Sequence, residues 1–148
     1  MNKAFVREPE ETGARNCPRC GSHGVSVGRA TLEAHLSADA LRQLAESAWY
    51  CPFAKCAVAY FDEFDRHVEA DLLERPMYPK DPDAPLCNCF GLSIADVDAD
   101  LVEGTPVRVR QLIEKSRSEL ADCERASPDG RCCVPNVQRY YMRMRSEA

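Results

Sequence analysis

Residues 17–21 read Cys17-Pro18-Arg19-Cys20-Gly21, and thirty residues after Cys20 comes Cys51-Pro52-Phe53-Ala54-Lys55-Cys56. Two cysteines separated by two to four residues can direct both sulfurs at one metal ion from a single tight turn. Gly21 permits the backbone conformation that such a turn requires. The pattern therefore predicts a four-thiolate site formed by Cys17, Cys20, Cys51 and Cys56.

Four thiolates in tetrahedral geometry suit zinc or a single rubredoxin-type iron, and zinc is favoured for paired knuckles of this kind. Four protein ligands leave no open position for a reactive water, so we expect a structural role for this ion. Binding of such an ion supplies folding free energy on the order of 10 kcal/mol.

The other five cysteines have a different spacing. Cys87-Asn88-Cys89 is followed after 33 residues by Cys123, and after 8 or 9 more by the pair Cys132-Cys133. This spacing fits no zinc ribbon, and it suits ligands on loops that surround two irons rather than one ion. Either Cys132 or Cys133 could complete this second quartet.

The chain has nine cysteines among 148 residues, and its first twenty residues contain no apolar signal segment. We therefore expect a cytoplasmic protein with no membrane insertion, where thiols stay reduced and bind metals rather than form disulfides. An odd number of cysteines also leaves one thiol over in any scheme of disulfides alone.

The formal net charge is −5. A zinc ion and an oxidised [2Fe–2S] core, each on four thiolates, would add about −2 each and give about −9. Nucleic acid is therefore not an expected partner, because its phosphates require a basic surface.

Composition and spacing predict an α+β chain with two small metal-binding units. Residues 16–75 are expected to form a zinc-ribbon or treble-clef-like module, and residues 86–148 a small all-helical module. Prolines 76, 79, 82 and 85 predict a semi-rigid, extended linker over residues 76–85. Residues 1–15 are polar and are expected to form a loose arm.

Local patterns predict the elements of each module. In the first, a strand is expected over Val25–Leu32, a helix capped by Ser37 that reaches Ala48, and a strand over Ala57–Phe61. In the second, one helix should begin after Ser93 and stop at Gly104, one should begin at Pro106, and the last should begin near Pro135.

The segments Cys87-Asn-Cys89-Phe90-Gly91-Leu92-Ser93 and Ser127-Pro-Asp-Gly-Arg-Cys132-Cys133, with Cys123 between them, resemble the [2Fe–2S] domain of bacterioferritin-associated ferredoxins. Together with the first quartet and the proline-rich approach to Cys87, the chain is more similar still to the amino-terminal region of CopZ-type copper chaperones. That region joins a zinc module to a [2Fe–2S] module in this order, and the resemblance covers about residues 16–137.

The resemblance implies that Cys17, Cys20, Cys51 and Cys56 hold zinc. It also implies that Cys87, Cys89, Cys123 and Cys133, with Cys132 as the alternative to Cys133, hold a [2Fe–2S] cluster. Two departures matter. The second quartet does not end in the Cys-x2-Cys of bacterioferritin-associated ferredoxins. No Met-x-Cys-x-x-Cys loop is present, so the carboxy-terminal copper-carrying domain of CopZ-type chaperones is expected to be lacking.

The expected function is electron transfer by an iron–sulfur protein with a structural zinc site, serving copper or heavy-metal handling through a redox or metal-trafficking partner. Reduction of Cu(II) to Cu(I) is one such role. The alternatives are a thiol-based metal chaperone, sensor or adaptor without a redox role, and a double-zinc scaffold. No catalytic residue is assigned, since the motifs favour an accessory protein over a classical enzyme.

Three further groups of residues have simpler explanations than metal binding. The histidines His23, His35 and His67 are expected at surface or partly buried positions, with only His23 near a metal. The acidic run from Asp62 to Asp71 is expected to be a solvated face, and the methionines are expected to fill gaps in the core.

Overall fold

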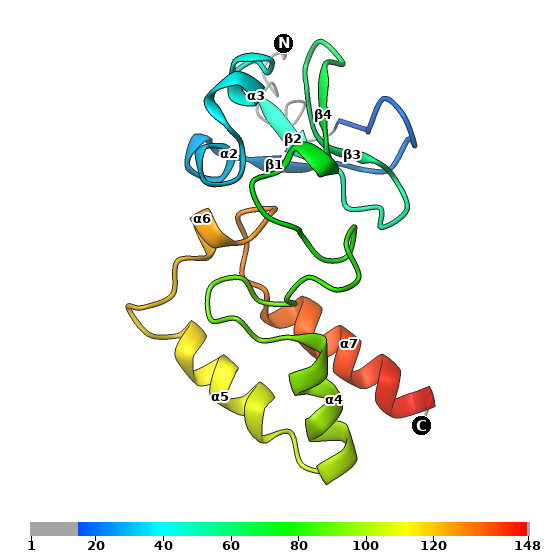
Figure 1. Ribbon diagram of the computed structural model, residues 1–148, viewed down its shortest axis with the longest axis vertical. Coiled ribbons are helices and arrows are strands. Elements are labelled where there is room, and N and C mark those ends of the chain that lie inside the picture. Colours follow the sequence, from blue (N-terminus) through cyan, green and yellow to red (C-terminus); the bar gives the residue numbers. More distant parts are fainter. Residues whose placement is uncertain (1–14, 148) are drawn as a thin grey trace, which may run out of the picture.

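The computed structural model describes residues 15–147, and all of the expected polar arm except Arg15 lies outside this range. An antiparallel sheet with two short helices forms one end of the molecule, and a group of helices forms the other (Figure 1). The chain is therefore α+β, as expected from its sequence. None of the helices between residues 15 and 147 combines the length and apolar character of a membrane-spanning segment.

The sheet is a four-stranded antiparallel meander in which each strand pairs with the next one along the chain. Its strands are β1 (Val25–Val27), β2 (Ala48–Tyr50), β3 (Val58–Asp62) and β4 (His67–Glu69). Val25 pairs with Tyr50, so the start of β1 lies beside the end of β2. This register brings the residues that precede β1 and the residues that follow β2 to the same end of the sheet.

The helices of the first half are α2 (Arg29–His35) and α3 (Ala38–Arg42), followed after β4 by the 3-10 turn η1 (Ala70–Leu72). The second half contains α4 (Ile94–Glu103), α5 (Val107–Ser116), α6 (Cys123–Ala126) and α7 (Val134–Glu147). Helices α4, α5 and α7 pack on one another, whereas α6 packs on α2 of the first half (Figure 1).

The two faces of the sheet have different cores. Tyr50 and Tyr60 face α2 and α3, and they pack with apolar residues of those helices such as Leu32. Trp49 and Phe61 lie on the opposite face and pack with the buried cysteines of the first quartet. A third core joins α4, α5 and α7 in the second half.

The expected strand over Val25–Leu32 is wrong in its second part, because the strand ends at Val27 and Arg29 begins α2. Ser37 caps a helix as expected, since its hydroxyl accepts a hydrogen bond from the Ala40 amide at 3.2 Å. That helix stops at Arg42 rather than near Ala48. The Ala45 amide instead donates to the buried Asp62 carboxylate at 2.9 Å, which directs the chain into β2.

The signals expected at both ends of the first helix of the second half are confirmed. The Ser93 side chain accepts from the Asp96 amide, and the Asp96 side chain accepts from the Ser93 amide. Gly104 ends α4 with a φ of +82°. The next helix was expected to begin at Pro106 but begins one residue later, at Val107, and no side chain caps it. Helix α7 begins at Val134, close to the expected Pro135.

The segment 76–85 contains hydrogen-bonded turns rather than the extended linker geometry expected from its prolines. The Asp81 amide donates to the Met77 carbonyl at 2.8 Å, and the Ala84 amide donates to the Asp81 carbonyl at 3.1 Å. Met77 and Ala84 are both buried, so this segment is packed against the rest of the molecule.

Candidate metal centres

The first quartet lies at the end of the sheet where β1 begins and β2 ends. Cys17 and Cys20 occupy the turn before β1, in which the Cys17 amide donates to the Ser22 carbonyl and the Gly21 amide to the Cys17 carbonyl. Gly21 has a φ of +78°, as this turn requires. Cys51 and Cys56 occupy the connection between β2 and β3.

The four sulfur atoms of Cys17, Cys20, Cys51 and Cys56 all lie within 4.8 Å of one another. The Cys17 and Cys56 sulfurs are 3.9 Å apart, and those of Cys20 and Cys51 are 3.6 Å apart. A disulfide would require about 2.05 Å. Four sulfurs placed about 2.3 Å from a zinc ion at tetrahedral corners would be separated by about 3.8 Å. The observed spacing therefore fits a tetrahedral four-thiolate ion.

The surroundings of Cys20, Cys51 and Cys56 shift the pKa values of their thiols in opposite directions. Burial would raise the pKa of Cys20, but hydrogen bonds from Ser22 outweigh burial and lower this pKa to about 6. Burial raises the pKa of Cys51 to about 12 and also raises that of Cys56. Cys20 therefore ionises more readily than Cys51 or Cys56, and a bound cation favours the ionised form of these buried thiols.

Lys80 supplies positive charge to the same site from the segment 76–85. Its ammonium group donates to the carbonyl oxygens of Phe53 at 2.8 Å and Cys56 at 3.0 Å. The charge of Lys80 also acts to lower the pKa of Cys51. Sequence reasoning missed this residue, because its only signal was a lysine among prolines.

Cys87 and Cys89 occupy a turn of the same kind as the first zinc-knuckle turn. The Cys87 amide donates to the Leu92 carbonyl at 3.1 Å, and the Gly91 amide donates to the Cys87 carbonyl at 2.9 Å. Gly91 has a φ of +75°, close to that of Gly21. Cys87 therefore occupies the same position in its turn as Cys17 does in the first knuckle turn.

Amide groups point at the sulfurs of this second group. The Phe90 amide lies 3.4 Å from the Cys87 sulfur, and the Asp122 amide lies 3.0 Å from the Cys89 sulfur. The backbone of Cys133 also acts to lower the pKa of Cys123, although burial outweighs it and raises that pKa. Such donors favour the thiolate over the thiol.

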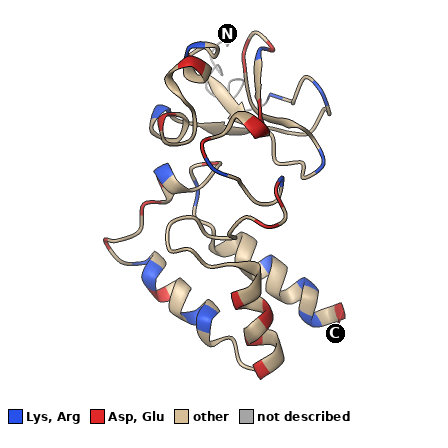
Figure 2. Ribbon diagram, in the orientation of Figure 1, with Lys and Arg blue, Asp and Glu red and all other residues tan. Residues whose placement is uncertain are grey.

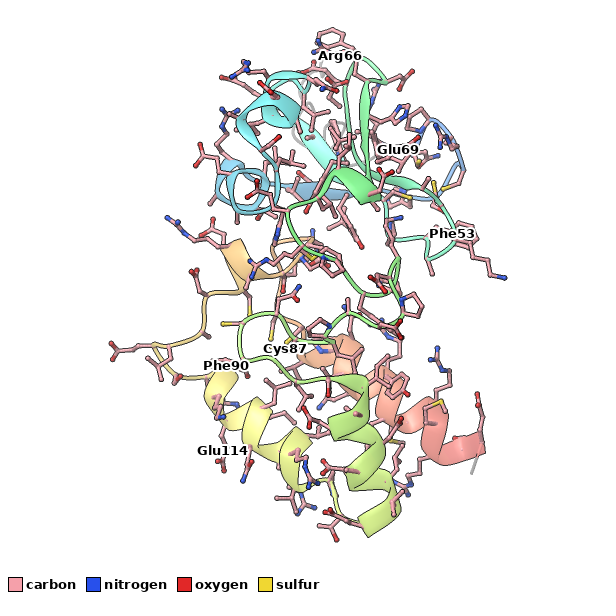
Figure 3. The ribbon with its side chains drawn as sticks, in the orientation of Figure 1. Phe53, Arg66, Glu69, Cys87, Phe90 and Glu114 are labelled. Carbon is pink, nitrogen blue, oxygen red and sulfur yellow. The ribbon has the colours of Figure 1, made fainter. Side chains whose placement is uncertain are left out.

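Cys132 and Cys133 differ in burial at this second group. Cys133 is buried in the helical core beside Cys87, whereas Cys132 is exposed at the surface. A hydrogen bond from the Cys133 thiol lowers the pKa of Cys87 to about 6, while the same bond and burial raise the pKa of Cys133. Cys87 lies in the loop between the two halves (Figure 3).

Within residues 15–147, the first quartet is the only set of cysteine, histidine or acidic residues that brings three or more ligand atoms within 4.8 Å. Cys87, Cys89, Cys123 and Cys133 are more widely spaced.

The histidines do not join either cysteine group. His23 is 3.3 Å from the Asn16 side chain, and His67 lies on the surface beside Arg19 and Glu69. His35, expected at the surface or partly buried, is fully buried. Asp62 was expected on a solvated face but is fully buried. Its carboxylate accepts hydrogen bonds from three backbone amides and from the Arg66 side chain.

Residues 14–73 match the sequence model of a CopZ-type family described as a zinc binding domain. No curated protein matches the sequence significantly. The X-ray structure of the Archaeoglobus fulgidus CopZ N-terminal domain is similar to this chain with a TM-score of 0.71. The two share 20% sequence identity, and the similarity covers 84% of this chain and 96% of that one. At this identity the likeness establishes a shared fold. The sequence match and the geometry of the first quartet together support a four-cysteine zinc-binding site, in a chain that shares the fold of the CopZ N-terminal domain.

Proposed function

We propose that this protein transfers single electrons in copper or heavy-metal handling, with a [2Fe–2S] cluster held by Cys87, Cys89, Cys123 and Cys133. Zinc on the first quartet would have a structural role, because four protein thiolates leave it no free coordination position. A [2Fe–2S] cluster supplies a one-electron redox couple when it is bound.

The observation that carries this proposal is the knuckle turn at Cys87. Its hydrogen bonds and the φ of Gly91 repeat those of the turn at Cys17, in a place where no zinc-ribbon spacing exists. The amides of Phe90 and Asp122 add donors to two of the four sulfurs, those of Cys87 and Cys89. Hydrogen bonds to ligand sulfurs are one of the means by which proteins set cluster potentials.

The exposure of these residues favours exchange of electrons with a partner. Cys89 and Cys123 are half-buried, whereas Cys87 and Cys133 are buried in the helical core. Cu(II) that takes up one electron leaves as Cu(I), which soft thiolate and thioether ligands bind. An external electron donor must then restore the reduced state of the protein.

Metal and sulfide analysis of anaerobically purified protein tests this function. We expect about one zinc, two irons and two acid-labile sulfides per chain. We also expect a visible absorption that dithionite bleaches reversibly and an electron paramagnetic resonance signal of the reduced protein. A colourless protein with two zinc ions and no sulfide after anaerobic reconstitution would instead indicate a structural scaffold.

The exposure of Cys132 favours a second candidate, a thiol-based metal chaperone, sensor or adaptor without a redox role. An exposed thiol next to the buried Cys133 could capture a soft ion such as Cu(I). This function predicts stoichiometric Cu(I) uptake by the iron-free protein that is lost in Cys132→Ser. Retention of uptake in that variant would count against it.

A further inference from the structure

The loop that carries two of the proposed cluster ligands is held by the sheet half of the molecule. This ligand loop, residues 123–133, begins with the short helix α6, which packs on α2, and ends at Cys133 before α7 (Figure 1). Cys123 and Cys133 are its two ends, so the path of the loop between them determines how their sulfurs are placed.

Three side chains of the sheet half donate hydrogen bonds to backbone carbonyls of the ligand loop. The Thr31 hydroxyl donates to the Glu124 carbonyl, and the Tyr60 hydroxyl donates to the Pro128 carbonyl. The His35 Nε2 atom lies 3.0 Å from the Ser127 carbonyl, which requires a proton on Nε2. These anchoring side chains, Thr31, His35 and Tyr60, are all fully or almost fully buried.

The hydrogen bonds within the ligand loop are short-range, such as those from the Ser127 amide to the Cys123 carbonyl at 3.0 Å and from the Gly130 amide to the Ser127 carbonyl at 3.2 Å. Its only helix is the four residues of α6, and Ser127 and Cys133 are its only buried residues. Gly130 has a φ of +71°, and a Cβ atom on it would come within 2.6 Å of the Thr31 hydroxyl oxygen. The loop therefore lies directly against the anchoring side chains, which supply its long-range hydrogen bonds to the sheet half.

We propose that Thr31, His35 and Tyr60 are positioning residues for the second metal centre, which hold Cys123 and Cys133 in the arrangement that a cluster requires. The zinc-binding half is then the template on which the ligand loop is ordered, in addition to its own metal site. This inference rests on the proposed function of the second cysteine group. None of the three side chains touches the proposed cluster ligands' sulfurs through a hydrogen bond, so they act through the loop backbone.

The double variant Thr31→Val and Tyr60→Phe tests this role, because it removes two anchoring hydroxyls and leaves side chains of similar shape. Tyr50→Phe is the matched control. The Tyr50 ring lies 5.6 Å from the Tyr60 ring, and its hydroxyl has no hydrogen-bond partner among the described residues. Zinc content should be the same in the double variant, the control and the wild type.

Hydrogen exchange of the amides in residues 123–133 is measured first, on zinc-loaded protein before any iron is added. Loss of two hydrogen bonds of ordinary strength should speed this exchange at least about tenfold in the double variant and leave the control unchanged. After reconstitution, the double variant should lose its cluster faster in air and show a shifted midpoint potential relative to both wild type and control.

Equal exchange of the ligand loop in the double variant and the wild type would overturn the inference. So would a cluster whose potential and lifetime are unaffected. A wild-type protein that takes up no cluster would overturn the proposed function itself. The exchange comparison, made without iron, would still decide whether the anchoring side chains order the loop.

Discussion

At the scale of single residues, two adjacent cysteines have opposite environments. Cys133 is buried with Cys87 in the core of the helical half, and Cys132 faces solvent. Adjacent side chains seldom reach the same site, because the backbone turns them in different directions. The burial of Cys133 in one core with Cys87 supports its place among the proposed ligands.

We predict that Cys133→Ser loses most of the iron and sulfide of the reconstituted protein, whereas Cys132→Ser keeps both. The physical reason is that only Cys133 shares a buried site with Cys87. Iron and sulfide analysis after anaerobic reconstitution provides the measurement, and zinc content serves as the internal control for folding. Loss of iron in Cys132→Ser with retention in Cys133→Ser would reverse the assignment.

At the scale of elements, a buried carboxylate joins α4 to α5. Asp100 is fully buried near the end of α4, accepts from the Val109 amide at 2.9 Å and lies 2.8 Å from the Arg108 guanidinium. Charge is also divided among the helices, because acidic residues gather on α4 and basic residues on α5 and α7 (Figure 2). Asp100 thus fixes the turn between two helices of opposite charge.

We predict that Asp100→Asn lowers the free energy of unfolding by about 1.5–3 kcal/mol, the usual range for hydrogen bonds to charged groups. Glu103→Gln is the control. Glu103 also contacts Arg108 but is half exposed, so its loss should cost at most about 1 kcal/mol. Urea unfolding followed by circular dichroism measures both variants, and equal losses would contradict a special role for Asp100.

The Asp100 carboxylate also makes the stability of the helical half depend on pH in the acid range. Burial would raise the pKa of Asp100, but hydrogen bonds from Val109 and Arg108 outweigh burial and lower it below the usual value. Its stabilising contribution is therefore complete above the unfolded-state pKa near 4 and is lost as the pH falls through the lower folded-state pKa. Asp100→Asn should flatten this part of the stability profile.

At the scale of the whole molecule, His35 lies where the two halves meet. Burial lowers the pKa of His35, and the nearby positive charge of Arg75 adds to this effect. Since the unfolded chain binds the proton more tightly than the folded one, stability is complete above the unfolded-state pKa near 6.5 and falls as the pH drops below it.

We predict that wild-type stability falls between pH 7 and pH 5 with a slope of at most about 1.4 kcal/mol per pH unit from this group. His35→Gln should be less stable at pH 7 and lose this slope, whereas His67→Gln on the surface should keep it. Urea unfolding at a series of pH values provides the test. An unchanged slope in His35→Gln would show that another group is responsible.

Zinc removal should unfold the sheet half, because the quartet lies in one core with Trp49, which is the only tryptophan of the chain and is 2% exposed. Such a site supplies on the order of 10 kcal/mol of binding free energy to folding. We therefore predict that a chelator shifts Trp49 fluorescence to longer wavelength and that added zinc reverses the shift. Unchanged emission from protein shown by analysis to be zinc-free would contradict this.

Local chemistry allowed much of the fold to be predicted. The spacing of Cys17 to Cys20 and of Cys51 to Cys56 predicted the knuckles, since a turn of this length is a property of a few neighbouring residues. The capping box at Ser93 and the stop at Gly104 were likewise predicted, because both are made within one helix end. The strand expected over Arg29–Leu32 was wrong, because Thr31 and Leu32 are buried through helix packing rather than strand pairing.

The sequence by itself determined the two zinc-knuckle turns and most helix ends, because each depends on residues close together in the chain. The tertiary structure decided which of Cys132 and Cys133 is buried and that Asp62 is buried. It also decided that Thr31, His35 and Tyr60 form hydrogen bonds with the ligand loop. These contacts join residues 17 to 93 positions apart. No local pattern specifies such pairs, because only packing of the two halves brings them together.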